Sequence, residues 1–206
     1  MAVIEVYADI WCPFTHVGLR TVVRRRSELG RADVAIRVRS WPLELVNGAP
    51  LDVDATAAHV EELREQVAPN LFAGFDPNRF PRTTLPALAL ASAAYRKDDG
   101  TGEAVSLALR DALFEKGRDI SRPDFLTNLA QTYGLNDGDA ADVGEVLADW
   151  HQGESRGVKG SPHFFCGDVE AFCPSLIITK DEVGRVHIER SVEPLDAFLE
   201  ECFASV

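Results

Sequence analysis

Several classes of protein are excluded by what this sequence has little of. Its four cysteines, at positions 12, 166, 173 and 202 of 206 residues, are too few and too scattered for a disulfide framework. No two of them have Cys-x2-Cys or Cys-x4-Cys spacing, and the five histidines are dispersed, so we expect no zinc site. No apolar run approaches the roughly 20 residues of a membrane span.

Positive charge is also scarce. A formal net charge of −12 argues against nucleic acid or an anionic membrane as the main partner, because both require basic patches. The N-terminus has no basic segment followed by a long apolar one, so we expect no signal peptide and a cytoplasmic protein. The composition is otherwise that of a soluble globular chain, long enough for one large domain or a domain with an insertion.

Cys12 stands at the junction of two patterns. Residues 3–7 alternate between apolar and polar like a strand, and the spacing from about Pro13 to Leu29 is helical. Pro13 suits the first helical position. The free N–H groups and the positive dipole end of such a helix favour a thiolate, so we predict a Cys12 pKa below the ordinary value of about 8.5. Thiolates attack disulfides, which makes a reactive cysteine the favoured interpretation over a buried core cysteine.

The rest of the chain predicts an α/β fold with a large all-helical insertion. Residues 34–39 alternate and complete a β-α-β unit. Helical segments then follow one another to about residue 153, the last from about Asp139 to Gln152. Strand patterns return at 163–166 and in a hairpin of 175–178 with 185–188, before a final helix from Pro194. We therefore predict one domain from 1–45 and 154–206, and a helical insertion domain from 46–153.

A second chemical element precedes the strand at 163. Ser161-Pro162 leads directly into it, and a proline at such a position often has a cis peptide bond, although a trans proline at a strand start is the alternative. A cis bond would turn the N–H and C=O of Ser161 toward an extended peptide or a thiol ligand. We predict a cis bond, with Pro162 in contact with Cys12.

Taken together, these residues resemble the thioredoxin fold of the DsbA-like family. The FrnE-like branch, the kappa glutathione transferases and the 2-hydroxychromene-2-carboxylate isomerases are the nearest groups. The resemblance covers nearly the whole chain, and it rests on five stretches: Asp9 to Phe14, Phe80 to Thr84, Ala112 to Ile120, Tyr133 to Leu135 and Gly157 to Pro162. It implies that Cys12 is the attacking cysteine and Pro162 the cis-proline of the family.

One position departs from the family pattern. Redox members carry Cys-x-x-Cys, and this chain has Thr15 in place of the second cysteine. That second thiol normally releases the mixed disulfide, a step that threonine cannot perform. The hydroxyl of Thr15 could instead donate a hydrogen bond to the Cys12 sulfur. The resemblance therefore implies the fold and the place of the site more directly than it implies disulfide-oxidase activity.

Three functions remain open. The favoured one is a thiol–disulfide oxidoreductase with a single active-site cysteine, Cys12, assisted by Thr15 and Pro162. Its mixed disulfide would be resolved by glutathione or mycothiol, or else by Cys166 or Cys173. The second is a thiol-dependent transferase or isomerase of the kappa or chromene type, although those members usually have serine at position 12. The third is a relative that binds a peptide or thiol without catalysis.

The remaining expectations concern binding. A protein disulfide or a small thiol is the expected partner; no bound cofactor is expected, and a homodimer is left open. His16 and His163 flank the site in the sequence and could shift the pKa of the Cys12 thiol or relay a proton. The residues expected to contact substrate are Trp11, Pro13, Phe14, His16, Ser161 and His163.

Overall fold

A four-stranded sheet forms the centre of the molecule. The computed structural model describes residues 3–136, 138–182 and 186–204. The strands lie in the order β2-β1-β3-β4, with β2 parallel to β1 and each of the other two antiparallel to its neighbour. They are β1 (Val3–Ala8), β2 (Ala35–Ser40), β3 (His163–Cys166) and β4 (Val169–Phe172). The parallel pair is joined by a helix and is the predicted β-α-β unit.

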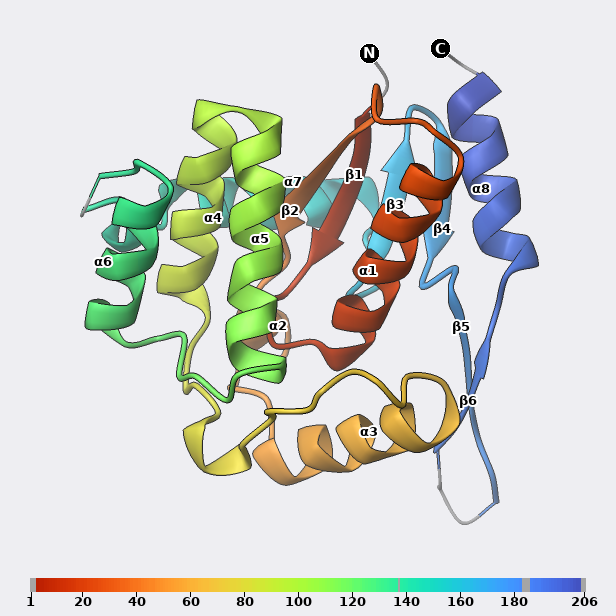
Figure 1. Cartoon of the computed structure of the whole chain (residues 1–206), viewed down its shortest axis with the longest axis horizontal. Coiled ribbons are helices and arrows are strands. Elements are labelled where there is room, and N and C mark those ends of the chain that lie inside the picture. Colours follow the sequence, from red (N-terminus) through yellow and green to blue (C-terminus); the bar gives the residue numbers. More distant parts are fainter. Residues whose placement is uncertain (1–2, 137, 183–185, 205–206) are drawn as a thin grey trace.

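Two helices cover one face of this sheet (Figure 1). They are α1 (Pro13–Glu28) and α8 (Glu193–Ala204). Alternate side chains of β1 point to this face, because successive residues of a strand face opposite sides. Ile4, Val6 and Ala8 are fully buried there in one apolar cluster with residues of both helices.

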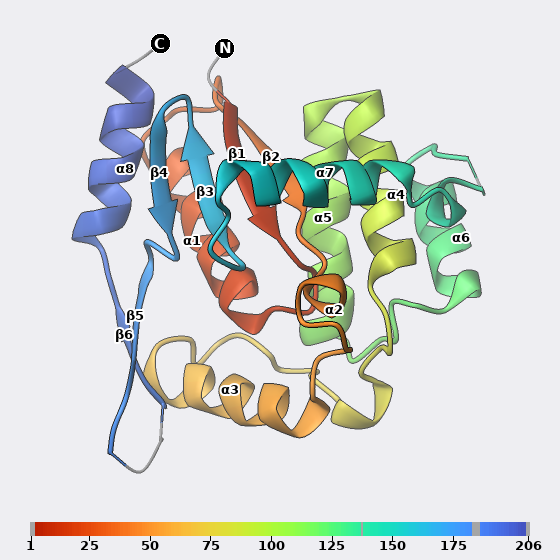
Figure 2. The same cartoon turned by 180° about the vertical axis from the view of Figure 1, so that it is seen from behind.

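The opposite face is crossed by α7 (Gly144–Arg156), as Figure 2 shows. The helix approaches the sheet closely at Gly153, where a Cβ atom would lie 2.6 Å from the Trp41 ring and 3.0 Å from the Tyr7 ring. A larger residue could not occupy that position without moving these rings. The helix expected from about Asp139 begins later, because residues 139–141 form a separate 3-10 turn.

The regular elements described between β2 and β3 are all helical. They are α2 (Leu43–Val46), α3 (Val53–Gln66), η1 (Pro77–Arg79), α4 (Leu85–Lys97), α5 (Asp99–Phe114), α6 (Pro123–Thr132), η2 (Asp139–Ala141) and α7. α4 and α5 lie side by side next to β2, and α3 lies across the end of the sheet at which α1 begins (Figure 1). One apolar cluster includes residues of these helices together with Ile10 and Trp11. The helical region and the Cys12 segment therefore share a core.

A second sheet contains only β5 (Leu176–Lys180) and β6 (Val186–Arg190), which form the predicted hairpin. Its turn is expected at residues 181–184, of which 183 and 184 lie outside the described residues. The hairpin leaves the main sheet and reaches α3, where the Ile188 N–H donates to Gln66 Oε1 at 2.8 Å. Sequence analysis missed β4, a four-residue edge strand with half of its side chains exposed, which gives only a weak alternation.

Candidate active site

Cys12 occupies the N-cap position of α1, and Pro13 is the first helical residue. The backbone of Cys12 is extended (φ −75°, ψ 112°), so the first turn of the helix begins directly after it. The cysteine is only 4% exposed. Its thiol donates a hydrogen bond to the carbonyl oxygen of Ser161, with an Sγ–O distance of 3.1 Å. Cys12 is therefore a protonated thiol enclosed by protein in this structure.

The Ser161-Pro162 loop lies against the start of α1, and its peptide bond is cis. The Asp9 N–H donates to Ser161 Oγ at 2.9 Å, and the hydroxyls of Ser161 and Thr15 are hydrogen-bonded at 2.8 Å. On the other side, the Cys173 N–H donates to the carbonyl of Pro162 at 3.0 Å. These bonds connect the loop to β1, α1 and the end of β4. Cys12, Thr15, Ser161 and Pro162 are thus brought together.

The predicted lowering of the Cys12 pKa is wrong for this enclosed site. Burial raises the pKa of the thiol, because the thiolate would lose its hydration. The Thr15 hydroxyl, the Thr15 N–H and the Ser161 hydroxyl act in the opposite direction, and the carboxylate of Asp9 adds to the rise. The helix N-terminus does supply hydrogen-bond donors, as expected, but they do not outweigh burial. Sequence analysis could not supply this result because it did not show how deeply the sulfur lies.

Aromatic residues close the site on the side of the helical region. Trp11 is fully buried and stacks on Phe80, with ring centroids 5.7 Å apart and an interplanar angle of 9°. Phe14 is partly exposed and its ring lies 5.2 Å from that of His59 on α3. Pro13 is buried. Of these three residues, each expected to contact substrate, only Phe14 has an accessible surface in this conformation.

His16 binds a carboxylate that sequence analysis did not identify. Its Nε2 lies 2.6 Å from Glu115 Oε1, and its ring is packed between Phe72 and Phe114. Burial lowers the pKa of His16, so the imidazole is neutral at pH 7 and donates its Nε2–H to Glu115. Glu115 also accepts the N–H groups of Phe72 at 2.9 Å and Ala73 at 3.3 Å.

These donors determine the ionisation of Glu115. Burial by itself raises its pKa, but the bonds from His16 and from the two backbone N–H groups lower it to about 2. The carboxylate therefore connects α1 and the end of α5 to the loop at residues 72–73. Glu115 lies in one of the stretches that carry the family resemblance, yet that pattern gave no indication of its partner.

A second buried pair lies beneath Cys12. Asp9 is fully buried, and its carboxylate accepts the backbone N–H groups of Ile10 and Leu43, both at 2.6 Å. Burial raises the pKa of Asp9 to about 6. Arg110, only 1% exposed, donates to the Asp9 carbonyl at 3.2 Å, and burial lowers its pKa to about 10, so that it remains a cation. Neither residue was assigned a role from the sequence, where Arg110 appears as an ordinary polar position in a helix.

His163 does not reach this site through any hydrogen bond of the described residues. It pairs with Tyr7 in the sheet, and both side chains therefore lie on the face crossed by α7, opposite to α1. Its Nδ1 accepts the Lys159 N–H at 3.2 Å, and its ring packs against Phe165 and Phe172. Burial lowers the pKa of His163.

The other three cysteines lie in two parts of the fold. Together with Cys12 they make four cysteines, all of which are free thiols. Cys166 lies at the far end of β3, in the core between the sheet and α8, where it interacts with Cys202. Cys173 follows β4 and shares an apolar cluster with Ile10 and Trp11. Of the two proposed resolving thiols, Cys173 is therefore the one beside the Cys12 segment.

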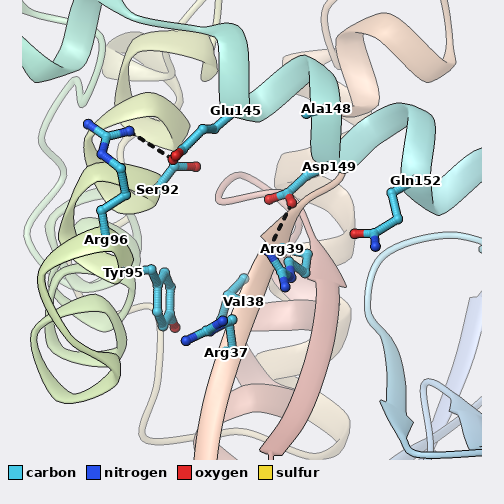
Figure 3. A pocket seen from close by; sticks show the side chains of 10 residues that line it. All are labelled: Arg37, Val38, Arg39, Ser92, Tyr95, Arg96, Glu145, Ala148, Asp149 and Gln152. Atoms are coloured by element: carbon cyan, nitrogen blue, oxygen red, sulfur yellow. Dashed lines mark hydrogen bonds and ion pairs between the residues drawn. The ribbon is translucent and has the colours of Figure 1, made fainter.

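A polar cavity of about 570 Å³ lies elsewhere, between β2, α4 and α7 (Figure 3). Its three arginines are each bound to carboxylates: Arg37 to Asp99, Arg39 to Glu5 and Asp149, and Arg96 to Glu145 and Asp139. None of the residues predicted for the site lines this cavity.

Two further features of the described residues limit the chemistry. No group of three or more His, Cys, Asp or Glu side chains in residues 3–136, 138–182 and 186–204 is placed to hold a metal ion. Over the same part of the chain, every helix is too short or too polar to cross a bilayer.

Comparison with known proteins gives a family and a fold. A family model described as DSBA-like thioredoxin domain matches residues 3–179. No curated protein matches the chain. Several solved structures resemble it, and the ones that follow are each less than 20% identical, so they show the fold alone.

The first is a probable DsbA oxidoreductase from Streptomyces coelicolor, with 18% identity, a TM-score of 0.68 and coverage of 99% of this chain and 89% of that one. The second is the cytosolic disulfide reductase DsbM from Pseudomonas aeruginosa, with 16% identity, a TM-score of 0.63 and coverage of 99% and 100%. A further DsbM structure contains GSH. The third is a 2-hydroxychromene-2-carboxylate isomerase, with 13% identity, a TM-score of 0.63 and coverage of 82% and 88%.

Proposed function

Because the chain belongs to the DSBA-like thioredoxin domain family, we propose that it is a thiol–disulfide oxidoreductase that attacks its substrate with Cys12. One observation carries this proposal. The Cys12 thiol lies at the N-terminus of α1 and is hydrogen-bonded to the carbonyl of Ser161, next to the cis-proline. The attacking sulfur and a backbone segment that could bind an extended substrate are therefore adjacent.

The chemistry begins when Cys12 loses its proton. The thiolate attacks one sulfur of a substrate disulfide, a new S–S bond forms to Cys12, and the other sulfur leaves as a thiolate that takes up a proton. Burial is the largest factor that raises the Cys12 pKa. Movement that exposes the sulfur to a substrate therefore removes this factor and leaves the hydroxyls of Thr15 and Ser161, which favour the thiolate. Exposure of the Cys12 sulfur to a substrate and formation of its thiolate are therefore coupled.

The second step needs a thiol from elsewhere, because position 15 is threonine. A small thiol such as glutathione or mycothiol can supply it: its thiolate attacks the Cys12 sulfur, the bound half of the substrate leaves as a thiol, and a second equivalent of the small thiol then releases Cys12. The GSH in the Pseudomonas aeruginosa DsbM structure supports this class of co-substrate, and its description as cytosolic supports a reducing compartment, the cytoplasm. Thr15 remains a positioning residue, since its hydroxyl holds Ser161 at 2.8 Å.

Intact-mass analysis tests the proposal. The reduced protein is incubated with oxidised glutathione, and the wild type is compared with Cys12→Ser and with Cys202→Ser as a matched buried-cysteine control. We expect the wild type and Cys202→Ser to gain one glutathionyl group and Cys12→Ser to gain none. If no disulfide modifies the wild type, the proposal is wrong, and a thiol-dependent transferase or isomerase of the kappa or chromene type becomes the better hypothesis.

A further inference from the structure

We propose that Cys173 is an internal resolving thiol, which forms a disulfide with Cys12 and takes the part that the second cysteine of a Cys-x-x-Cys motif would play. This inference rests on the proposed function, because it requires a mixed disulfide at Cys12. It goes further in naming which group of the chain attacks that mixed disulfide.

Both cysteines are bound to the same short loop. The Cys12 thiol donates to the carbonyl of Ser161 at 3.1 Å, and the Cys173 N–H donates to the carbonyl of the next residue, Pro162, at 3.0 Å. β3 begins and β4 ends at the end of the sheet where α1 starts (Figure 2). The loop and the two cysteines therefore meet at one end of the fold.

The segment after Cys173 also contacts α1. A Cβ at Gly18 would lie 3.3 Å from Ser175 Oγ and 3.5 Å from Pro162 Cγ. Val17 of the same helix shares an apolar cluster with Cys173. Residues 173–175 are thus held against the first turns of the helix that begins at Cys12, and Cys173 is 6% exposed.

The electrostatics of the two thiols agree with this geometry. Burial raises the pKa of Cys173 to about 12, and a negative charge on Cys12 would add to that rise. The backbone of Cys173 has φ +46°, in the left-handed region that few residues other than glycine adopt. Such conformations occur preferentially at functional sites.

Cys166 and Cys202 do not share these features. They interact with each other in the core beneath α8, and burial together with that contact raises the pKa of Cys202. Cys166 is at the end of β3 opposite to Pro162, across from Val169. The two buried cysteines beneath α8 thus serve as matched controls for the one beside the loop.

The proposed step balances. Cys12 first forms a mixed disulfide with one half of the substrate, and the other half leaves as a thiol. The Cys173 sulfur then attacks Cys12 Sγ, the bond from Cys12 to the substrate breaks, and the departing thiolate takes up the proton that Cys173 loses. The substrate disulfide gains two electrons and two protons, and Cys12 and Cys173 together lose the same. Two equivalents of a small thiol reduce the internal disulfide and reset the protein.

Burial raises the pKa of the Cys173 thiol, which makes this step slow at neutral pH. Only a small fraction of such a thiol is thiolate at pH 7, and below its pKa that fraction rises about tenfold with each pH unit. The mixed disulfide should therefore live long enough to be isolated, and its decay should accelerate with pH in the same proportion while the fold is retained.

The test follows an isolated adduct. The Cys12–glutathione adduct is prepared for the wild type, Cys173→Ser, Cys173→Ala and Cys166→Ser, and freed of small molecules. We expect the wild type and Cys166→Ser to lose glutathione in a first-order process independent of protein concentration, leaving a protein two hydrogens lighter than the reduced form. Peptide mapping should then identify a Cys12–Cys173 link. Both Cys173 variants should retain the adduct, and Thr15→Cys in the Cys173→Ser background should restore its loss.

The outcomes separate the two proposals. If the adduct forms and persists equally in the wild type and in Cys173→Ser, or if mapping joins Cys12 to a different cysteine, the internal resolving role is wrong and the proposed function stands. If no adduct forms at Cys12 in any protein, both proposals fail. The peptide map of the wild type decides the matter even if a Cys173 variant folds poorly.

Discussion

The carboxylate of Glu115 is expected to contribute strongly to stability, and Glu115→Gln is the substitution that tests it. The carboxylate accepts three hydrogen bonds, from His16 Nε2 at 2.6 Å, Phe72 N at 2.9 Å and Ala73 N at 3.3 Å. Glutamine keeps one oxygen acceptor and places an NH₂ group where the second oxygen was. That NH₂ group faces an N–H donor, so at least one of the three bonds is lost and one donor remains unpaired.

The expected magnitude follows from the pKa of Glu115. Its fall from 4.5 to about 2 corresponds to about 3 kcal/mol of preference for the carboxylate in the folded state. Because the side chain is only 18% exposed, solvent screening removes little of this. A depressed folded-state pKa gives stability that is present above the unfolded value and is lost as the pH falls through 4.5 toward about 2. Glu115→Gln should therefore lower the free energy of unfolding by about 2–3 kcal/mol at pH 7.

Urea denaturation at pH values between 3 and 7 measures this difference. The gap between the wild type and Glu115→Gln should narrow as the pH falls below about 4.5, because the unfolded wild-type chain then binds a proton at Glu115 that the folded protein does not yet bind. Glu61→Gln is the control, since that residue is 62% exposed in a surface pair with Arg64 and should change stability little. A gap at pH 7 no larger than that of the control, or one that is the same at every pH, would refute the reasoning.

Two further predictions concern the charges around Cys12. The midpoint of Cys12 alkylation by iodoacetamide should lie above the ordinary thiol value of about 8.5, because burial raises the pKa; a midpoint below that value would contradict the enclosed site. Asp9→Asn removes a negative charge facing the thiol and should move that midpoint to lower pH. Asp9 itself has a folded-state pKa of about 6 against an ordinary 3.8, so the folded state binds more protons than the unfolded one. Wild-type stability should fall by about 3 kcal/mol as the pH rises through this window, and urea titrations of Asp9→Asn should lack that fall.

The part of the site that could be predicted from the sequence is the part fixed by local patterns. A strand pattern followed shortly afterwards by Cys12 and Pro13 indicates where a helix begins, and the structure has Cys12 at that N-cap. Ser161-Pro162 leads into β3, whose antiparallel pairing with β1 returns the loop to the start of the same helix. The expected thioredoxin-like fold of the DsbA-like family is confirmed by the match to the family model.

The part that could not be predicted depends on burial and on contacts between distant segments. Glu115 is 99 positions from His16, and Arg110 is 101 from Asp9, so no local pattern connects them. The rise of the Cys12 pKa has the same origin, because the helix N-terminus is visible in the sequence and the depth of the sulfur is not. The division into 1–45 with 154–206 and an insertion of 46–153 stays a prediction. The helix α7, which crosses the predicted boundary at 153, packs on the main sheet.

The central claim is that Cys12 attacks disulfides and that position 15 lacks the thiol that would release the resulting mixed disulfide. Dithiol-dependent reduction of insulin tests this claim most directly. The wild type, Cys12→Ser and Thr15→Cys are compared at equal concentration. We predict slow turnover for the wild type, none above background for Cys12→Ser, and turnover several-fold faster than wild type for Thr15→Cys, whose new thiol is on the first turn of α1. Activity in Cys12→Ser, or equal rates for the wild type and Thr15→Cys, would contradict the account.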